Sequence, residues 1–282
     1  MSPTPGPSGT PDQGTSGDRA LRPAATVLLL RQQQDGDGGL AVFMVRRNRK
    51  VAFMPSAWVF PGGRVDDADA LLDHPRVRGG ESAAARMGLS RPEALPFLVA
   101  AVRETLEESG IWLGEGRPPA EARDALNADA CTLAEVLERY DLHLDLDVLH
   151  PWSWWVTPEA EPRRYDTRFF AALVDSDEGV HDAGETVESA WLSVDDASAR
   201  ADRGELPMAP PTWWTLRELS AARTSTSVLD GGRPSARICP VLKSGPDGLS
   251  LLLPGHPEHP DGPIAGLPVD IRFSQGRWWA RS

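Results

Sequence analysis

The stretch that most constrains this chain runs from residue 99 to residue 111 and reads VAAVRETLEESGI. Its apolar residues recur at helical spacing, which would hold one side of a helix against a core. Gly110 stands where a C-terminal helix cap belongs. Spacings of three and four residues put three carboxylates on the opposite side of this helix: Glu104, Glu107 and Glu108.

These three carboxylates repel one another, which costs stability. A hard cation such as Mg²⁺ or Mn²⁺ prefers carboxylate oxygens and would remove that cost. Taken alone, however, a glutamate-rich helix face is usually a solvated surface. The sequence on either side of the helix therefore has to decide between a metal site and a plain surface helix.

The segment before the helix contains an apolar run, 57–60, which predicts a strand ended by a Pro-Gly-Gly sequence. Far downstream, Glu185 lies six residues before Trp191. A PGG loop followed by R-E-x-x-E-E-x-G and an aliphatic residue is similar to the signature of the Nudix hydrolases, and residues 103–111 match it. The chain therefore resembles that family.

The resemblance implies an α/β (α+β) fold, a mixed β-sheet sandwiched between helices, here with a small β extension at the C-terminus. Layered packing is also what the strand and helix texture suggests. It implies a catalytic site with Mg²⁺ or Mn²⁺ held by four carboxylates: Glu104, Glu107, Glu108 and Glu185. Arg103 would orient these ligands. Two glycines would let the loop approach the helix without a clash: Gly62 and Gly63.

One departure from the signature concerns Asp69. The residue six positions after Gly63 is usually Glu, and it pairs with an arginine that follows after seven further residues. Here that position holds Asp69, and residues 70–102, which are 33 residues, intervene before Arg103. The sequence thus leaves open whether Asp69 pairs with Arg103 and braces the metal-binding helix.

A signature split in this way resembles the branch that includes peroxisomal coenzyme A diphosphatases, as do the phrases RYDTRFF at 164–170 and LLLPG at 251–255. We therefore expect hydrolysis of the pyrophosphate bond of a nucleoside diphosphate linked to another group, with coenzyme A or acyl-coenzyme A as the leading substrate. ADP-ribose or NADH is the alternative. A non-catalytic binding module is the alternative class, and the intact glutamates count against it. The general base is left open among Glu104, Glu108, Glu185 and Glu188.

Contacts with the substrate are predicted from charge and aromaticity. Arginines suit phosphate recognition, although a solvated loop explains them equally well; the candidates are Arg46, Arg47 and Arg64. Trp154 or Trp155 could stack on a nucleobase, but packing is the default for strand aromatics. Adjacent strand residues face opposite ways, so we expect at least one of the two to pack.

The charge composition of the chain limits the kinds of molecule that it can be expected to bind. The chain has 29 basic and 41 acidic residues, a net charge of −12, which argues against general binding to nucleic acid or anionic membranes. An anionic small-molecule substrate bridged by metal ions is still compatible. The apolar run 24–30 is too short to span a bilayer. The start of the chain lacks a signal-peptide pattern and only two cysteines are present, so we expect a cytoplasmic enzyme and leave a homodimer open.

We divide the chain into three parts: a disordered segment 1–20, a Nudix domain 21–224 with an insertion at 70–95, and a β-rich extension 225–282. Strands are predicted at 24–31 and 40–47. A single helix is predicted over 120–139. Pro96 is expected to break or kink the chain between the helix of the insertion and the carboxylate helix.

Overall fold

The computed structural model describes residues 20–33, 39–48, 56–71, 74–175, 186–222, 224–245 and 248–281. Two expectations therefore fall outside the described residues. One is the disordered N-terminal segment, apart from Ala20, and the other is the position of Glu185. Among the helices within the described ranges, none combines the length and hydropathy that a membrane crossing requires.

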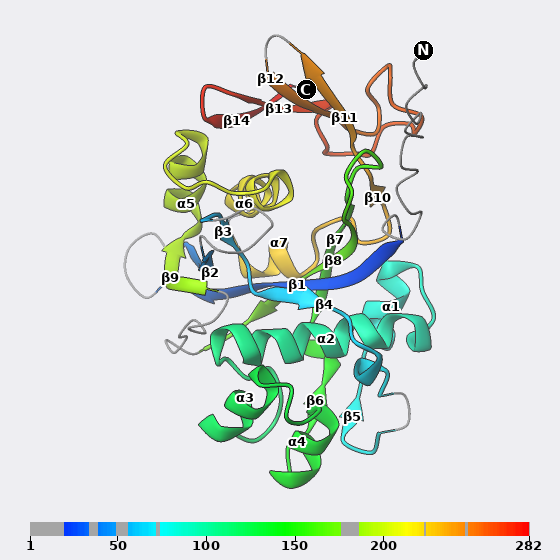
Figure 1. Ribbon diagram of the computed structural model, residues 1–282, viewed down its shortest axis with the longest axis vertical. Coiled ribbons are helices and arrows are strands. Elements are labelled where there is room, and N and C mark those ends of the chain that lie inside the picture. Colours follow the sequence, from blue (N-terminus) through cyan, green and yellow to red (C-terminus); the bar gives the residue numbers. More distant parts are fainter. Residues whose placement is uncertain are drawn as a thin grey trace, which may run out of the picture.

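An eight-stranded mixed sheet forms the centre of the molecule (Figure 1). Its strands are β1 (Leu21–Gln32), β2 (Leu40–Arg47), β3 (Trp58–Val59), β4 (Gly62–Arg64), β7 (His150–Val156), β8 (Arg164–Leu173), β9 (Thr186–Ser193) and β10 (Arg237–Ile238). They run in the order β10-β7-β8-β1-β2-β3, while β4 pairs with β1 and β9 with β2. The centre of β1 is buried on both faces, which suits its continuous apolar run.

The longest strand pairing joins two segments that are far apart in the chain. β1 and β8 run parallel over ten positions, from the pair Leu21 and Arg164 to the pair Leu30 and Leu173. β4 pairs antiparallel with β1 at residues 24–26, so the Gly-Gly segment lies beside the middle of the sheet. Strand pairing thus brings the loop predicted to touch the carboxylate helix to a fixed place.

One face of the sheet carries the described elements that lie between β4 and β7 in the chain, among them the insertion and the carboxylate helix (Figure 1). These are η1 (Asp67–Asp69), β5 (Val77–Arg78), α1 (Glu81–Met87), α2 (Arg91–Ser109), α3 (Ala120–Asn127), α4 (Leu133–Arg139), β6 (Leu144–Asp145) and η2 (Leu146–Val148). The apolar side of α2 lies in the core on this face; its buried residues there include Leu98, Val99, Val102 and Leu106.

The carboxylate helix is longer than predicted, and the expected break at Pro96 is wrong. Helix α2 begins after Ser90, which forms a capping box with Glu93, and continues through Pro96 to a left-handed Gly110 with φ 73°. Pro96 lacks the N–H that would have donated to the backbone one turn earlier, and the helix nevertheless continues through it. The buried Leu95 and Leu98 on either side hold the helix against the core.

The predicted helix over 120–139 is also wrong, because the segment forms two helices. Helix α3 ends at Asn127, and Asp129 adopts a left-handed conformation with φ 51°. Helix α4 then starts afresh, with the Thr132 side chain accepting a hydrogen bond from the Glu135 backbone N–H.

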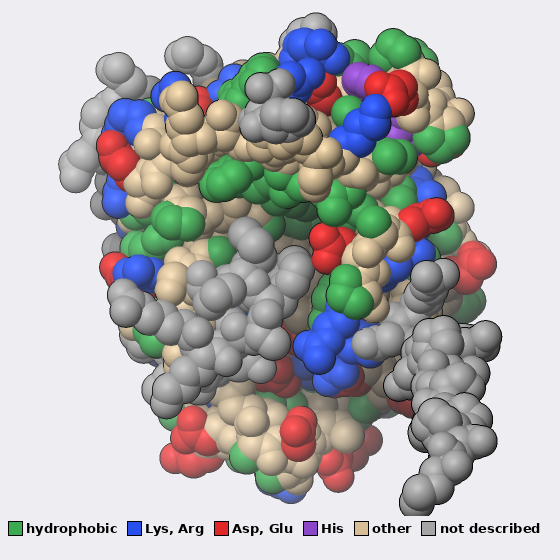
Figure 2. Space-filling view, turned by 45° about the horizontal axis from the view of Figure 1, so that its top comes forward, with side chains coloured by type: hydrophobic (Ala, Val, Ile, Leu, Met, Phe, Trp, Pro, Cys, Tyr) green, Lys and Arg blue, Asp and Glu red, His purple; other side chains and the backbone are tan. Residues whose placement is uncertain are grey.

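The other face of the sheet is covered by α5 (Val194–Asp202), α6 (Pro210–Ala222), α7 (Ser225–Leu229) and a four-stranded antiparallel sheet. The strands of this second sheet are β11 (Val241–Gly245), β12 (Gly248–Leu252), β13 (Asp270–Ser274) and β14 (Arg277–Arg281). It packs through Leu251 and Ile271 into the same core as Trp213 of α6. Figure 2 shows hydrophobic side chains gathered in a band across the upper part of one face.

Candidate active site

The centre of the site is the buried side chain of Arg103. Its Nε and Nη2 each donate a hydrogen bond to Asp69, at 2.9 Å, and Nη2 also donates to the Arg64 carbonyl at 2.8 Å. Its Nη1 donates to Glu104 at 2.9 Å and to Glu107 at 3.0 Å. One guanidinium therefore joins the loop after β4 to two of the three carboxylates on α2.

The pairing of Arg103 with Asp69 bridges the insertion. Asp69 closes the short helix η1, is 1% exposed, and also accepts a hydrogen bond from the Asp66 backbone N–H at 2.8 Å. Among the described residues between Asp69 and the start of α2, two stretches form β5 and α1, and both contribute buried side chains to the core on this face. The structure thus places Asp69 opposite Arg103 although 33 residues separate them.

The ionic state of Arg103 follows from these contacts. Burial by itself lowers the pKa of the guanidinium, but the hydrogen bonds with Asp69 and the charges of Glu104, Asp69 and Glu107 outweigh that effect. The net result is a raised pKa, so the side chain keeps its positive charge.

The two glycines of β4 lie directly against the carboxylate face of α2. A Cβ atom on Gly63 would stand 2.4–2.5 Å from the carboxyl atoms of Glu104, and one on Gly62 would stand 2.3 Å from the Ala25 carbonyl oxygen. The Gly62 backbone N–H donates to Glu108 at 2.9 Å. Only glycine allows this approach, and the approach brings Glu104, Glu108 and the loop together.

Burial also sets the electrostatics of the carboxylates. Desolvation raises the pKa of Glu104 to about 7, against the lowering effect of Arg103 and with a further increase from the charge of Glu107. Desolvation likewise raises the pKa of Glu107. These groups resist ionisation in the folded protein. A bound divalent cation would favour the ionised carboxylates and so lower their pKa values.

The donors fit a divalent cation. Carboxylate oxygens are the ligands that Mg²⁺ and Mn²⁺ prefer, and Glu104, Glu107 and Glu108 all belong to the last part of α2. Within the described ranges, no three His, Cys, Asp or Glu side chains stand in a ready-made metal-holding group. Arg103 engages both Glu104 and Glu107, and Glu185 falls outside the described residues.

The last turn of α2 is held by residues that the sequence did not single out. Arg123 and Asn127 of α3 donate to the Glu107 carbonyl, at 3.0 and 3.3 Å. This turn carries two glutamates and no basic residue at the negative end of the helix dipole. Arg123 supplies the missing positive charge from another helix, which no local motif could have predicted.

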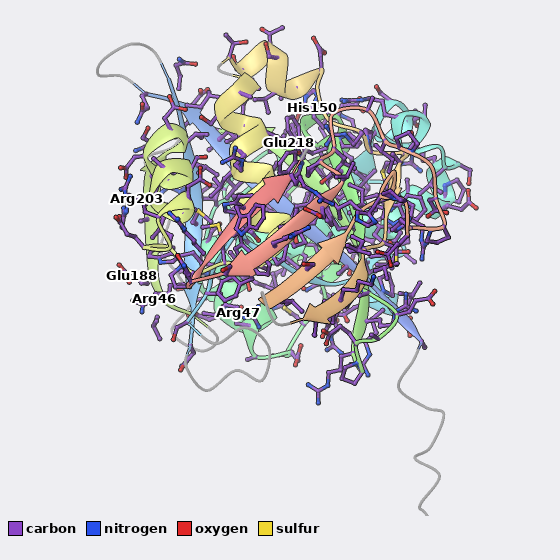
Figure 3. All side chains as sticks on the ribbon, turned by 90° about the horizontal axis from the view of Figure 1, so that it is seen from above. Arg46, Arg47, His150, Glu188, Arg203 and Glu218 are labelled. Carbon is purple, nitrogen blue, oxygen red and sulfur yellow. The ribbon has the colours of Figure 1, made fainter. Side chains whose placement is uncertain are left out.

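The predicted phosphate contacts lie at the ends of strands β2 and β4. Arg46 pairs with Glu188 across β2 and β9, with 3.3 Å between Nη1 and Oε2, and Figure 3 shows both beside Arg47. The Arg64 side chain is exposed, while its carbonyl accepts the bond from Arg103.

The two tryptophans face opposite sides of the sheet. Trp155 is 3% exposed and lies in the core beneath α6, so it packs. Trp154 donates from Nε1 to Asp166 at 2.6 Å, and the Arg168 guanidinium lies 3.7 Å from its ring centroid. Contacts within the protein therefore engage both rings.

Comparisons with known proteins agree with these features. A family model described as the NUDT19 Nudix domain matches residues 81–219. The acyl-coenzyme A diphosphatase NUDT19 of Gallus gallus is 28% identical, with 78% of this chain and 74% of that protein covered. The Homo sapiens protein of the same name is 27% identical, with 77% and 72% covered. The putative nudix hydrolase 7 of Caenorhabditis elegans is 30% identical, with 71% and 62% covered.

A solved structure gives the same result for the fold. The crystal structure of a NUDIX hydrolase from Alicyclobacillus acidocaldarius superimposes with a TM-score of 0.64 at 26% identity. The superposition covers 76% of this chain and 98% of that one.

Proposed function

We propose that this chain, which belongs to the Nudix hydrolase superfamily, cleaves the pyrophosphate bond of coenzyme A or acyl-coenzyme A. It is a Nudix pyrophosphohydrolase with the Nudix fold. The observation that carries the proposal is the network in which Arg103 joins Asp69 to Glu104 and Glu107 across the insertion. The relatives named acyl-coenzyme A diphosphatases support the choice of substrate.

Nudix hydrolases generally use divalent metal ions. We infer Mg²⁺ or Mn²⁺ here, with Glu104, Glu107 and Glu108 as ligands and Glu185 as a further one. When bound, such a cation neutralises charge on the pyrophosphate and favours attack by water. The donor chemistry of these carboxylates supports this inference.

The protein's own groups prepare the site. Arg103 fixes the Glu104 and Glu107 carboxyl groups, and the Gly62 N–H fixes Glu108. Both are hydrogen bonds to charged groups, the stronger kind. Pairing with an arginine does not separate the candidates, because Glu188 pairs with Arg46 and Glu104 pairs with Arg103; we therefore propose the general base from among Glu104, Glu108, Glu185 and Glu188. We assign Arg46, Arg47 and Arg64 to the phosphates of the substrate.

We also infer a cytoplasmic enzyme, with a homodimer left open. Both cysteines are free thiols, one half-buried and one buried, which supports a reducing compartment. The division at residue 225 is likewise a proposal. The four-stranded sheet that follows it supports the division, whereas the pairing of β10 with β7 ties this part to the central sheet.

A mass-resolved product assay tests the activity. The protein with Mg²⁺ or Mn²⁺ is incubated with coenzyme A, ADP-ribose, NADH and nucleoside triphosphates. The matched variants are Glu107→Gln with Glu108→Gln, and, as a control, Glu121→Gln with Asp124→Asn on the exposed side of α3. We expect phosphopantetheine from coenzyme A with the wild type and the control but not with the first pair.

Other outcomes discriminate between the alternatives. Cleavage of ADP-ribose or NADH alone would keep the chemistry and reject coenzyme A. Unchanged turnover in Glu107→Gln with Glu108→Gln would reject the metal-site assignment. If the wild type bound these compounds and cleaved none of them, the non-catalytic binding module would replace the enzyme.

A further inference from the structure

A cleft of about 690 Å³ opens directly beyond the carboxylate helix. One wall is the loop 110–118, and the rest comes from Asp145, Val148 and the end of β8 at 173–175. Gly110 is three residues beyond Glu107, which at the helical rise is about 4–5 Å along the axis. The cleft thus begins within one helical turn of the candidate metal ligands.

The walls of this cleft expose apolar side chains that the fold could have buried. Val148 is 39% exposed and Leu173 is 41% exposed, and both line the cleft. Because both residues line the same cleft, they give it a partly apolar wall against which an uncharged ligand could pack. Trp112 adds an aromatic wall, held by a hydrogen bond from its Nε1 to the Glu115 carbonyl at 3.3 Å.

The charges around the cleft disfavour phosphate. Three lining residues are acidic, Glu115, Asp145 and Asp175, against one lining cation, Arg117. Arg78 stands nearby, but it pairs with both Glu115 and Asp145. With Arg78 counted, three acids face two cations, so the wall keeps a small excess of negative charge; it does not attract the nucleotide half of the substrate and it tolerates an uncharged chain.

We propose that this cleft holds the uncharged arm of the substrate, the pantetheine chain and its acyl group, while the pyrophosphate lies against α2. The inference rests on the proposed function and adds the direction in which the substrate lies. An arm with two amide units reaches about as far as a four-residue peptide, roughly 13 Å. This equals the length of the four strand steps from Phe169, which is level with Gly62 beside Glu108, to Leu173, about 13 Å. The cleft volume falls within the range of roughly 300–1,000 Å³ for small-molecule pockets.

The test replaces Leu173 and Val148 by Asp, singly and together. The matched control is Leu21→Asp, because Leu21 lies on the neighbouring strand β1 at the other end of the β1–β8 pairing and is similarly exposed, at 38%. Steady-state kinetics with coenzyme A are combined with two fragment inhibitors, pantetheine and adenosine 3′,5′-bisphosphate. Thermal melting checks that each variant folds.

We expect KM for coenzyme A to rise by about tenfold in Leu173→Asp, because an aliphatic contact is lost and a charge is added. Inhibition by pantetheine should weaken equally, while inhibition by adenosine 3′,5′-bisphosphate stays unchanged. In the wild type, KM should fall as the acyl chain lengthens, and this trend should disappear in the double variant. Leu21→Asp should behave like the wild type.

Two results would overturn the inference. One is unchanged pantetheine inhibition in both cleft variants, and the other is an equal loss for both fragments. Wild-type protein that cleaves no coenzyme A would instead reject the proposed function. Pantetheine titrated into the wild type and Leu173→Asp by NMR separates these cases, since binding that is lost in the variant supports the cleft without any turnover.

Discussion

Two buried arginines, one on helix α2 and one on the strand β8 that α2 covers, have opposite surroundings. Arg103 is 8% exposed and Arg168 is 5% exposed. The two arginines are connected through neighbouring strands of the sheet. Arg168 is in register with Ala25 of β1, and Ala25 is in register with Gly63 of β4. Gly63 in turn lies against Glu104, the neighbour of Arg103 on α2. Arg103 belongs to the charged half of the helix, whereas Arg168 lies under Phe97 in its first half.

Arg168 has a much poorer set of charged partners. Its Nη1 donates to the Pro234 carbonyl at 3.2 Å, Asp166 lies 3.9 Å from its Nε, and that Nε has no hydrogen-bond partner within the described ranges. Burial lowers its pKa, only partly offset by Asp166. The ring of Trp154 supplies the remaining stabilisation.

The contrast between Arg103 and Arg168 shows that the two halves of α2 are held in place by different interactions. The half that carries the carboxylates is fixed by charge-assisted hydrogen bonds, which set the position of oxygen atoms. The other half is fixed by apolar packing and by an arginine stacked on an aromatic ring, which sets only the distance to the sheet. Removing a partner should therefore have very different consequences at the two places.

The largest effect is expected for Arg103→Met. The variant leaves Asp69 buried without its cation, which should lower the free energy of unfolding by about 3–5 kcal/mol. Urea unfolding measures it. Arg200→Met is the control, because Arg200 forms the same i,i+4 pair with Asp196 at the surface and should lose under about 0.5 kcal/mol. A loss below 1 kcal/mol for Arg103→Met would remove the distinction between the two arginines.

A pH series on metal-free protein should show the next largest effect. The folded-state pKa of Glu104 is about 7, above its ordinary 4.5, so folding favours the protonated form. Its contribution is fully present below pH 4.5 and is lost as the pH rises through 7. Relative to Glu104→Gln, the wild type in EDTA should lose on the order of 3 kcal/mol between pH 5 and pH 8.5. If the free energy of unfolding varied with pH in the same way for the wild type and Glu104→Gln, the raised pKa of Glu104 would be contradicted.

Arg123→Ala should have a smaller effect, about 1 kcal/mol, because it removes one hydrogen bond and a favourable charge at the end of α2. The sharper measurement is the Mg²⁺ concentration for half-maximal activity, which we expect to rise if Arg123 positions Glu107. Arg123→Lys, which keeps the charge, should recover part of the loss. An unchanged Mg²⁺ dependence would show that Arg123 only caps the end of α2 and does not position Glu107.

Arg168→Met should have the smallest effect, within about 1 kcal/mol of the wild type, because an apolar side chain of similar length removes a poorly paired charge. Turnover and Mg²⁺ dependence should not change. Trp154→Phe, which loses the indole hydrogen bond to Asp166, serves as the companion variant. Arg168 supports the first half of α2 from strand β8. A large loss of activity in Arg168→Met would therefore mean that catalysis depends on the first half of the helix as well as on the half that carries the carboxylates.

Local patterns predicted part of this arrangement. The face of α2 that carries Glu104, Glu107 and Glu108 and the strands β1 and β2 follow from residue spacing alone. The Arg103 and Asp69 pair came from the family resemblance, since no spacing rule crosses an insertion of this size. Strand alternation also placed Trp154 and Trp155 on opposite faces.

Features that depend on contacts in space were missed. Pro96 stays helical because buried neighbours hold its turn, and the segment 120–139 divides because a left-handed residue and a new cap lie inside it. Arg123 and Arg168 act through elements distant in the chain. Neither residue carries a local signal that distinguishes it from any surface arginine.

The parallel pairing of β1 with β8 has a consequence for how the chain is made. Leu21 and Arg164 are 143 positions apart (164 minus 21), which at a synthesis rate of about 5–20 residues per second is roughly 7–30 seconds of translation. Until β8 leaves the ribosome, the apolar centre of β1 has no parallel partner, and its unpaired backbone edge is exposed. Chaperones that bind apolar segments should therefore compete for β1 during this interval, and folding should be slow for a chain of this size because its central contact is so non-local.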